Sequence, residues 1–365
     1  MARSRGQESV HLAMQQGLAE GVFPGAVLWV AQAEQVVFHG AYGVIDGITR
    51  IPVTRATLFD LASLTKPLAT ALAVMHLVRE RGLELELPTR AVLPEFEAHP
   101  LGSATLEQLL RHQGGWAAYH PLYKGVTGQD PAARKAQLRR RLLALPPLGQ
   151  PGAQTVYSDL GFMVLDWVVA RWAGQSLDRI IRDHIYQPLG IEELFFPGLD
   201  CRLPPTHFAA TEQCPWRQAM LQGQVHDENA FAIGGVAGHA GLFGTARSVG
   251  RLVMALWAAW QGRSPDGVFE RQLVRRFLDA PQSGLRPLGF DRPEKGASSA
   301  GDHFSPASVG HLGFSGTSFW LDLQQQVGVV LLTNRVHPTR ANERIRYFRP
   351  RIHNLVMEGF RGGWG

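Results

Sequence analysis

Short apolar runs with the pattern of strands lie near both ends of the chain. Residues 26–31 and 35–43 are rich in β-branched and aromatic side chains and are broken by polar residues and glycine, which predicts an antiparallel hairpin. Residues 316–322 and 327–333 give the same signal and are separated by three glutamines. Both ends of the chain are therefore expected to contribute strands.

Elsewhere the apolar positions recur at the spacing of helices. Residues 63–81 are an almost continuous apolar run, which predicts a long helix that is buried on most sides. From about residue 84 to residue 230, helical segments alternate with loops rich in proline and glycine. The helices expected in the whole chain cover residues 8–20, 63–81, 105–112, 132–145, 159–173, 177–185, 247–261 and 341–358.

This order of elements predicts an α+β protein with two domains. Strands from both ends would form an antiparallel sheet flanked by helices, with an all-helical domain inserted between them. The sheet domain is expected to comprise residues 1–83 and 231–365, and the helical domain residues 84–230. A chain of 365 residues, 45% of them hydrophobic, buries enough core to fold without a disulfide or metal staple.

Charge and cysteine content exclude some classes of function. The formal net charge is only +5, and the densest basic run, residues 134–141, is interpreted as the solvated face of a helix. Because the run has no interleaved aromatic residues and matches no known module, no nucleic-acid partner is expected. Cys201 and Cys214 lack the spacing of a metal site. They are interpreted as free thiols, although a single bridge between them stays open.

The expected location follows from the apolar segments. The N-terminal residues are polar, and no apolar core of a signal peptide follows them. The longest apolar runs are far shorter than the roughly 18 residues that a membrane span needs. We therefore expect a cytoplasmic protein with no stable membrane span. A periplasmic chain whose signal has been removed is the alternative.

The first candidate for chemistry is an S-x-x-K motif, Ser63-Leu64-Thr65-Lys66, at the start of the buried helix. Residues three apart share one face of a helix, so the Ser63 hydroxyl and the Lys66 amine can meet. The positive end of the helix and burial both lower a lysine pKa, and a neutral Lys66 could take the serine proton. The alternative is a capping serine beside a structural lysine.

Two further motifs follow in a characteristic order. Tyr157-Ser158-Asp159 precedes an apolar helix, and His311-Leu312-Gly313 precedes a strand. The order S-x-x-K, Y-x-N, K-T-G is that of the serine β-lactamase and penicillin-binding protein superfamily. The chain resembles its class C-like branch, which includes family VIII esterases and D-amino-acid peptidases. The segment from Asn334 to Pro338 resembles a sub-branch that includes muropeptide amidases.

The resemblance implies a β-lactamase/transpeptidase-like fold and a set of catalytic roles. Ser63 would be the nucleophile that forms an acyl-enzyme, and Lys66 its general base or proton relay. Tyr157 would share the relay and protonate the leaving group. The backbone N–H groups of Ser63 and Phe314 would form the oxyanion hole, beside Gly313 of the third motif. No cofactor and no metal are implied.

The chain departs from the family pattern in two of its motifs, and Gln113-Gly114 also replaces a commoner Thr-Ser pair. Asp159 replaces the usual asparagine, and its charge could hold Lys66 protonated or repel an anionic substrate. His311 replaces the lysine that helps β-lactamases bind the substrate carboxylate. Because histidine is mostly neutral at pH 7, strong β-lactamase activity is not expected. Esters or uncharged amides are favoured instead.

Other residues are weaker candidates for substrate contacts. Trp116, Tyr119 and Trp216 could line an aromatic cleft, with packing in the core or at the rim as the alternative. The resemblance also places His239 near the pocket. Residues 226–229 combine histidine, two carboxylates and an asparagine. Because four consecutive residues do not easily converge on one ion, they are interpreted as a turn at the rim of the pocket rather than as a metal site.

The sequence thus predicts a serine hydrolase that cleaves an ester or amide through an acyl-enzyme on Ser63. Carboxylesterase and peptidoglycan-derived amide hydrolase are both open, and weak β-lactamase activity is an alternative. A different class stays open as well, a silent protein that binds muropeptides or β-lactams, and so does acyl transfer to an acceptor other than water. The expected partner is a small-molecule or muropeptide-like substrate, and the expected assembly is a monomer or homodimer.

Overall fold

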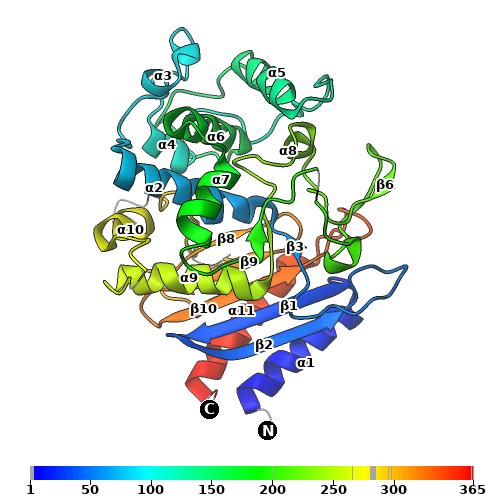
Figure 1. Cartoon of the computed structure of the whole chain (residues 1–365). Helices are drawn as coiled ribbons and strands as arrows, with labels where there is room; N and C mark the ends of the chain where they lie inside the picture. Colours follow the sequence, from blue (N-terminus) through cyan, green and yellow to red (C-terminus); the bar gives the residue numbers. More distant parts are fainter. Residues whose placement is uncertain are drawn as a thin grey trace.

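A five-stranded antiparallel sheet joins the two ends of the chain in the computed structural model (Figure 1). The structure describes residues 4–199, 201–264, 266–279, 285–294, 296, 298–362 and 364. The strand order is β2-β1-β10-β9-β8. The strands are β1 (Gly25–Gln32), β2 (Gln35–Gly43), β8 (Val309–Leu312), β9 (Ser318–Asp322) and β10 (Val327–Thr333).

The pairing of β1 with β10 brings the termini together. Ala26 lies opposite Thr333, and Gln32 lies opposite Val327. The two predicted hairpins are therefore confirmed, and they lie next to each other in one sheet. The sheet also contains one strand, β8, that the sequence did not predict. The segment before residue 316 itself forms β8, and a tight turn of residues 313–317 joins it to β9.

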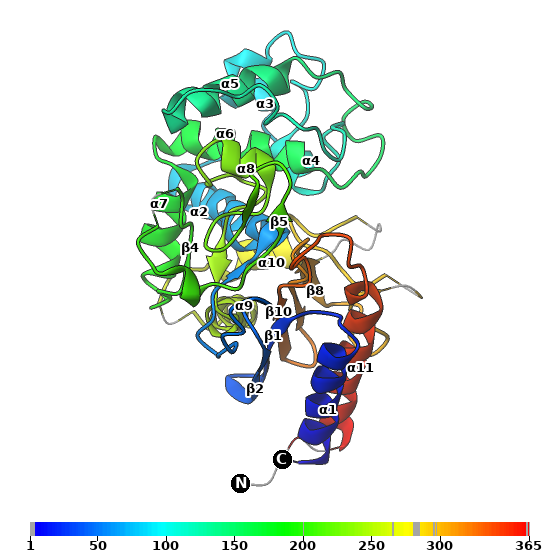
Figure 2. The same ribbon diagram turned by 90° about the vertical axis from the view of Figure 1, so that its right-hand side faces the viewer.

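Helices cover both faces of this sheet. Helices α1 (Arg5–Ala19) and α11 (Ile345–Gly362) lie side by side on one face, and α9 (Ala246–Trp260) lies on the other (Figure 2). Because both faces are covered, β1 is apolar at almost every position instead of alternating with polar residues. Gly250 lets α9 approach closely, since a Cβ there would lie 2.6 Å from the Trp29 ring.

The helical region lies beyond α9 and is joined to the sheet by one continuous set of buried side chains. The division into domains at residues 84 and 230 stays a prediction. The remaining helices are α2 (Leu72–Arg81), α3 (Thr89–Val92), α4 (Leu106–Leu110), α5 (Pro131–Leu143), α6 (Asp159–Ala173), α7 (Leu177–Ile181), α8 (Glu228–Ala232) and α10 (Arg271–Leu278). The short strands are β3 (Phe59–Asp60), β4 (Leu194–Phe195), β5 (Gln213–Cys214), β6 (Ala219–Met220) and β7 (Phe243–Gly244).

The helix expected over residues 63–81 is not regular. A 3₁₀ turn (Ala62–Leu64) leads into a π-helical segment (Lys66–Ala71), and only then does α2 begin. Pro67 has no N–H to donate, which is a physical reason for the irregular first turns. Such π segments are frequent at functional sites.

Two expectations about the whole chain can be compared with the structure. Cys201 and Cys214 are free thiols and form no bridge. Among the described residues, no helix has the length and apolar character that crossing a bilayer requires.

Candidate active site

A cavity of about 370 Å³ collects residues from all parts of the chain. It lies where the 3₁₀ turn Ala62–Leu64 meets the first turn of α6 and the turn between β8 and β9. Most of the candidate residues reach it. Its lining includes Ser63, Tyr119, Tyr157, Asp159, His239 and Phe314.

Ser63 lies in the 3₁₀ turn that immediately precedes the π-helical segment of Lys66. The Lys66 Nζ donates a hydrogen bond to the Ser63 Oγ over 3.0 Å. The residue before the serine, Ala62, has φ of +48°, a left-handed conformation that is strained for a residue with a side chain. The Asp60 carboxylate holds this turn by accepting from the Ala62 N–H over 2.8 Å. The strained turn lets the hydroxyl face the cavity.

Lys66 is completely buried and has a carboxylate partner. Its Nζ lies 2.7 Å from the Asp159 Oδ1 and also donates to the backbone oxygen of His239 over 3.3 Å. Burial alone would lower the pKa of Lys66, but the charge of Asp159 raises it above its ordinary value. Of the two states that the sequence left open, this contact favours a protonated Lys66 in the resting site. The charge of Asp159 outweighs the burial that the sequence suggested.

Asp159 reaches Lys66 because of the way α6 begins. The Ser158 side chain caps the helix by accepting from the Gly161 N–H over 3.2 Å, which places Asp159 in the first turn. The His112 Nδ1 accepts from the Ser158 N–H over 3.0 Å. Burial keeps the pKa of His112 well below its ordinary value, so this imidazole is a neutral acceptor. His112 is a supporting residue that the sequence reasoning did not identify.

Tyr157 is held between Lys66 and two histidine rings. Its ring centroid lies 4.8 Å from the Lys66 Nζ, 4.6 Å from the His112 ring and 5.8 Å from the His311 ring. Burial raises the pKa of Tyr157, although Lys66 opposes the shift. Tyr157 is therefore a phenol in the resting site, and it can donate a proton rather than accept one.

His311 lies on β8 behind Tyr157 and is buried. Its Nδ1 donates to the Leu312 backbone oxygen over 2.8 Å, and its Nε2 has no partner among the described residues. Burial, helped by the charge of Lys66, lowers the pKa of His311 to about 4, although Asp291 opposes the shift. This imidazole is neutral at pH 7 and offers no charge to an anionic substrate.

The turn after β8 is tied to the segment that precedes the nucleophile. The Ser315 Oγ donates to the Asp60 backbone oxygen over 2.6 Å, and the Thr317 Oγ1 donates to that of Leu61 over 3.1 Å. Gly313 is required here, because a Cβ would lie 2.0 Å from the Thr317 Oγ1. The turn therefore carries Phe314 to the same cavity as Ser63.

Charged residues also line the cavity, among them Asp227, Glu228 and Arg340. The His239 Nε2 lies 2.9 Å from the Asp227 Oδ1. Burial alone would raise the pKa of Asp227, but His239 and the Ala230 N–H hold it below its ordinary range. The Arg340 Nη2 lies 2.6 Å from the Glu212 Oε2 and 2.7 Å from the Glu228 Oε1. The Arg340 guanidinium is thus already paired with two carboxylates.

The turn expected at residues 226–229 is engaged in protein contacts. The His226 Nε2 lies 3.0 Å from the Glu212 Oε2. The Asp227 side chain caps α8 by accepting from the Ala230 N–H over 2.7 Å. Among the described residues there is no group of three or more histidine, cysteine, aspartate or glutamate side chains arranged to hold a metal ion.

The aromatic candidates separate into different environments. Tyr119 is 44% exposed and lines the cavity. Trp116 is 3% exposed and stacks on His99 with ring centroids 5.3 Å apart, so its assignment to the substrate cleft is wrong. The core holds it because an apolar ring gains more from full burial than from the rim. Trp216 packs against Tyr123 outside the residues that line the cavity.

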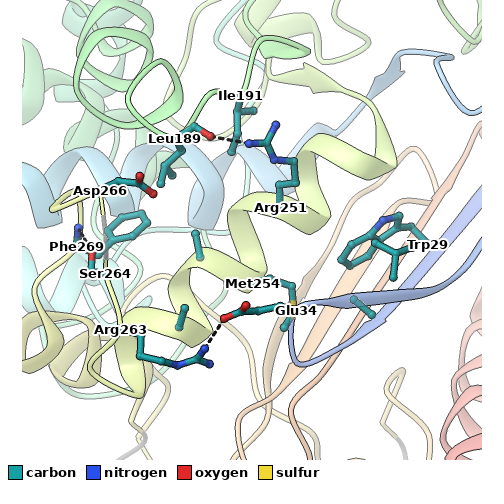
Figure 3. Close-up of a pocket in the computed structure, with 14 residues that line it drawn as sticks. Trp29, Glu34, Leu189, Ile191, Arg251, Met254, Arg263, Ser264, Asp266 and Phe269 are labelled. Atoms are coloured by element: carbon teal, nitrogen blue, oxygen red, sulfur yellow. Dashed lines mark hydrogen bonds and ion pairs between the residues drawn. The ribbon is translucent and has the colours of Figure 1, made fainter.

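A second cavity, of about 810 Å³, lies beside α9 and contains none of the motif residues. Figure 3 shows Arg251 donating to the Leu189 backbone oxygen on one side and Arg263 paired with Glu34 on the other. Its apolar lining includes Trp29, Met254 and Phe269.

The chain is similar to known proteins over most of its length. A family model described as Beta-lactamase matches residues 11–351. A protein named putative D-alanyl-D-alanine carboxypeptidase, from Escherichia coli (strain K12), is 32% identical over 346 residues, covering 86% of this chain and 79% of that protein. A protein named N-acetylmuramyl-L-alanine amidase, from Bacillus subtilis (strain 168), is 31% identical over 345 residues, covering 86% and 78%.

The fold also matches a solved structure. EstCE1, described as a hydrolase with promiscuous acyltransferase activity, superposes with a TM-score of 0.76 at 21% identity, covering 96% of this chain and 98% of that one. At this level of identity the likeness concerns the fold. The expected β-lactamase/transpeptidase-like architecture is confirmed.

Proposed function

We propose a function from one premise: the chain belongs to the β-lactamase family, and it is a serine hydrolase that cleaves esters or amides. In our proposal Ser63 attacks the substrate carbonyl and forms an acyl-enzyme, which water then hydrolyses. The observation that carries the assignment is the hydrogen-bonded series Ser63 Oγ, Lys66 Nζ and Asp159 Oδ1, with spacings of 3.0 and 2.7 Å, in one cavity.

The proton path must start from a protonated Lys66. As the Ser63 Oγ attacks, Lys66 passes one proton to Asp159 and accepts the serine proton in its place. Tyr157 then donates its phenolic proton to the leaving group. Lys66 returns a proton to Tyr157, and Asp159 returns one to Lys66. The proton of Ser63 has then in effect moved to the leaving group, and the three side chains are back in their resting states. Water then attacks the acyl-enzyme, and the same proton transfers run in reverse. The water takes the place of the leaving group and gives up its proton, and the Ser63 oxygen regains its proton from Lys66.

The developing oxyanion would be stabilised by the N–H groups of Ser63 and Phe314. The Phe314 N–H has no acceptor among the described residues, as a donor reserved for substrate requires. Such preorganised donors are often the largest contribution to catalysis. The proton path through Lys66, Asp159 and Tyr157 needs no metal or cofactor.

The charges of the cavity support a substrate without a carboxylate beside the reacting bond. His311 is neutral, and Arg340 is already paired with Glu212 and Glu228. Of the two activities named for the relatives, an amidase on a muropeptide-like amide fits this better than a carboxypeptidase, whose substrate ends in a carboxylate. We therefore place a peptidoglycan-derived amide first and a neutral ester second. A monomer or homodimer remains the expected assembly.

The test is hydrolysis of a p-nitrophenyl ester and of an N-acetylmuramyl peptide by wild type and by Ser63→Ala. The exposed Ser9, replaced by alanine, is the matched control. A fluorophosphonate probe should label wild type and Ser9→Ala on the peptide that contains Ser63. It should leave Ser63→Ala unlabelled. Turnover that survives in Ser63→Ala would remove the assignment. Binding of the muropeptide without turnover in wild type would favour the silent binding protein instead.

A further inference from the structure

Arg349, on α11, is a buried cation with no carboxylate partner among the described residues. The residue is 6% exposed. Its Nη2 donates to the backbone oxygens of Gly313, over 2.9 Å, and Thr317, over 2.7 Å. Its Nε has no acceptor in the part of the chain that the structure describes. Burial lowers the pKa of Arg349 well below its ordinary value, and Arg335 adds to the shift. A buried charge without a counter-ion is costly and calls for an explanation.

Holding the turn does not by itself explain the charge. The turn of residues 313–317 is already tied down by the Gly313 N–H bonded to the Thr317 oxygen, and by the bonds that Ser315 and Thr317 make to Asp60 and Leu61. A neutral donor could satisfy the same two carbonyl oxygens without the cost of burying a guanidinium. What a cation adds is an electric field on these peptide groups.

The field falls on the peptide group that matters for catalysis. The Gly313 carbonyl and the Phe314 N–H belong to one peptide unit, and resonance couples its two ends. A charge-assisted hydrogen bond to the carbonyl oxygen is stronger than a neutral one and makes the N–H of the same unit a better donor. On the C-terminal side of Phe314, the Arg335 Nε donates to the Phe314 carbonyl oxygen over 2.9 Å. Both carbonyls next to the proposed oxyanion donor are thus held by guanidinium groups.

We propose that Arg349 is a positioning residue for the oxyanion hole, which fixes and polarises the Gly313–Phe314 peptide from behind so that its N–H binds the tetrahedral intermediate. This inference rests on the proposed function. Arg349 touches neither substrate nor reacting atoms. Its effect should therefore appear in the stabilisation of the transition state and not in the binding of the ground state.

The test compares Arg349→Met, Arg349→Gln and Arg349→Lys with Ile352→Ala. Ile352 is buried on the same helix and serves as a control for loss of stability alone. The measurements are kcat and KM for a p-nitrophenyl ester, the inhibition constant of phenylboronic acid, and Tm. The boronate forms a tetrahedral adduct with the nucleophile, so it probes the oxyanion hole directly.

We expect Arg349→Met and Arg349→Gln to lower kcat about 10- to 100-fold, less than the loss of an entire oxyanion donor. KM should change little, and boronate affinity should fall in parallel with kcat. Arg349→Lys should recover part of both. Ile352→Ala should lower Tm and leave kcat and boronate affinity near wild type. If Arg349→Met does not fold, the result for Arg349→Gln decides whether the inference holds.

Wild-type kcat and boronate affinity in a folded variant without the charge would overturn the inference. The same holds if kcat and KM change only as much as in Ile352→Ala. If Ser63→Ala loses turnover while Arg349→Gln matches wild type, only this inference fails. If wild type itself neither hydrolyses esters nor binds the boronate, the proposed function fails first.

Discussion

The Asp159 carboxylate lies 2.7 Å from the Lys66 Nζ, and this contact sets the charge of the candidate active site. Lys66 is fully buried, and burial alone would lower its pKa. The carboxylate reverses this outcome. The resting site therefore contains a lysinium, a carboxylate and a phenol. A base is created only when Asp159 takes a proton.

Replacing this carboxylate should change the pH dependence of the reaction. In Asp159→Asn, Lys66 loses the charge that raises its pKa, so burial lowers the pKa relative to wild type. The serine proton can then be accepted only by a Lys66 that has already lost its own. We expect the acidic limb of the kcat/KM profile to move to higher pH. We also expect activity at pH 6 to fall about 10- to 100-fold. An unchanged acidic limb would mean that Asp159 takes no part in proton transfer.

Tyr157→Phe should separate substrates by their leaving groups. The phenol donates a proton to the leaving group in the proposed path, and an amine must be protonated before it departs whereas p-nitrophenolate need not be. We expect turnover of an anilide to fall by about 100-fold or more and that of a p-nitrophenyl ester to fall much less. Turnover rates of wild type and Tyr157→Phe, measured on both substrates, check this prediction. Equal losses would exclude Tyr157 as the acid and leave it a structural role.

His311→Lys should change the preference for charged substrates. The neutral imidazole, whose pKa burial lowers to about 4, would be replaced by a cation next to Tyr157. One favourable ion pair of about 1.4 kcal/mol corresponds to a tenfold change. We therefore expect the ratio of kcat/KM for an anionic β-lactam to that for a neutral ester to rise about tenfold. His311→Gln is the neutral control. The same ratio in both variants would show that this position does not select for charge.

The pair of Glu212 and Arg340 should contribute stability in a defined pH range. Burial alone would raise the pKa of Glu212, but hydrogen bonds from His226 and Arg340 lower it to about 2. A depressed pKa gives stability that is present above the ordinary value near 4.5 and is lost as pH falls toward 2.

Glu212→Gln should therefore lower the free energy of unfolding at pH 7 by about 2 kcal/mol. Solvent screening at the partly exposed Arg340 keeps the value below that of a fully buried pair. Urea unfolding at several pH values checks this. The difference from wild type should shrink between pH 4.5 and 2, and a constant difference would point to packing instead of charge.

The sequence by itself determined the parts of this protein that depend on local spacing. The two hairpins and the longer helices follow from the periods of apolar residues, because each side of a strand or helix must match its surroundings. The approach of Ser63 to Lys66 follows from their separation by three residues in consecutive helical turns. The order of the three motifs was enough to indicate the family.

Only the tertiary structure decided which distant groups meet and what charge they carry. Asp159 is 93 residues from Lys66 along the chain, and the way α6 packs brings its carboxylate to the amine. Packing likewise placed Trp116 in the core, His112 beneath Tyr157, and Arg349 behind the turn that presents Phe314. A protonation state depends on the sum of burial and all neighbouring charges in three dimensions. No local pattern of residues contains that sum.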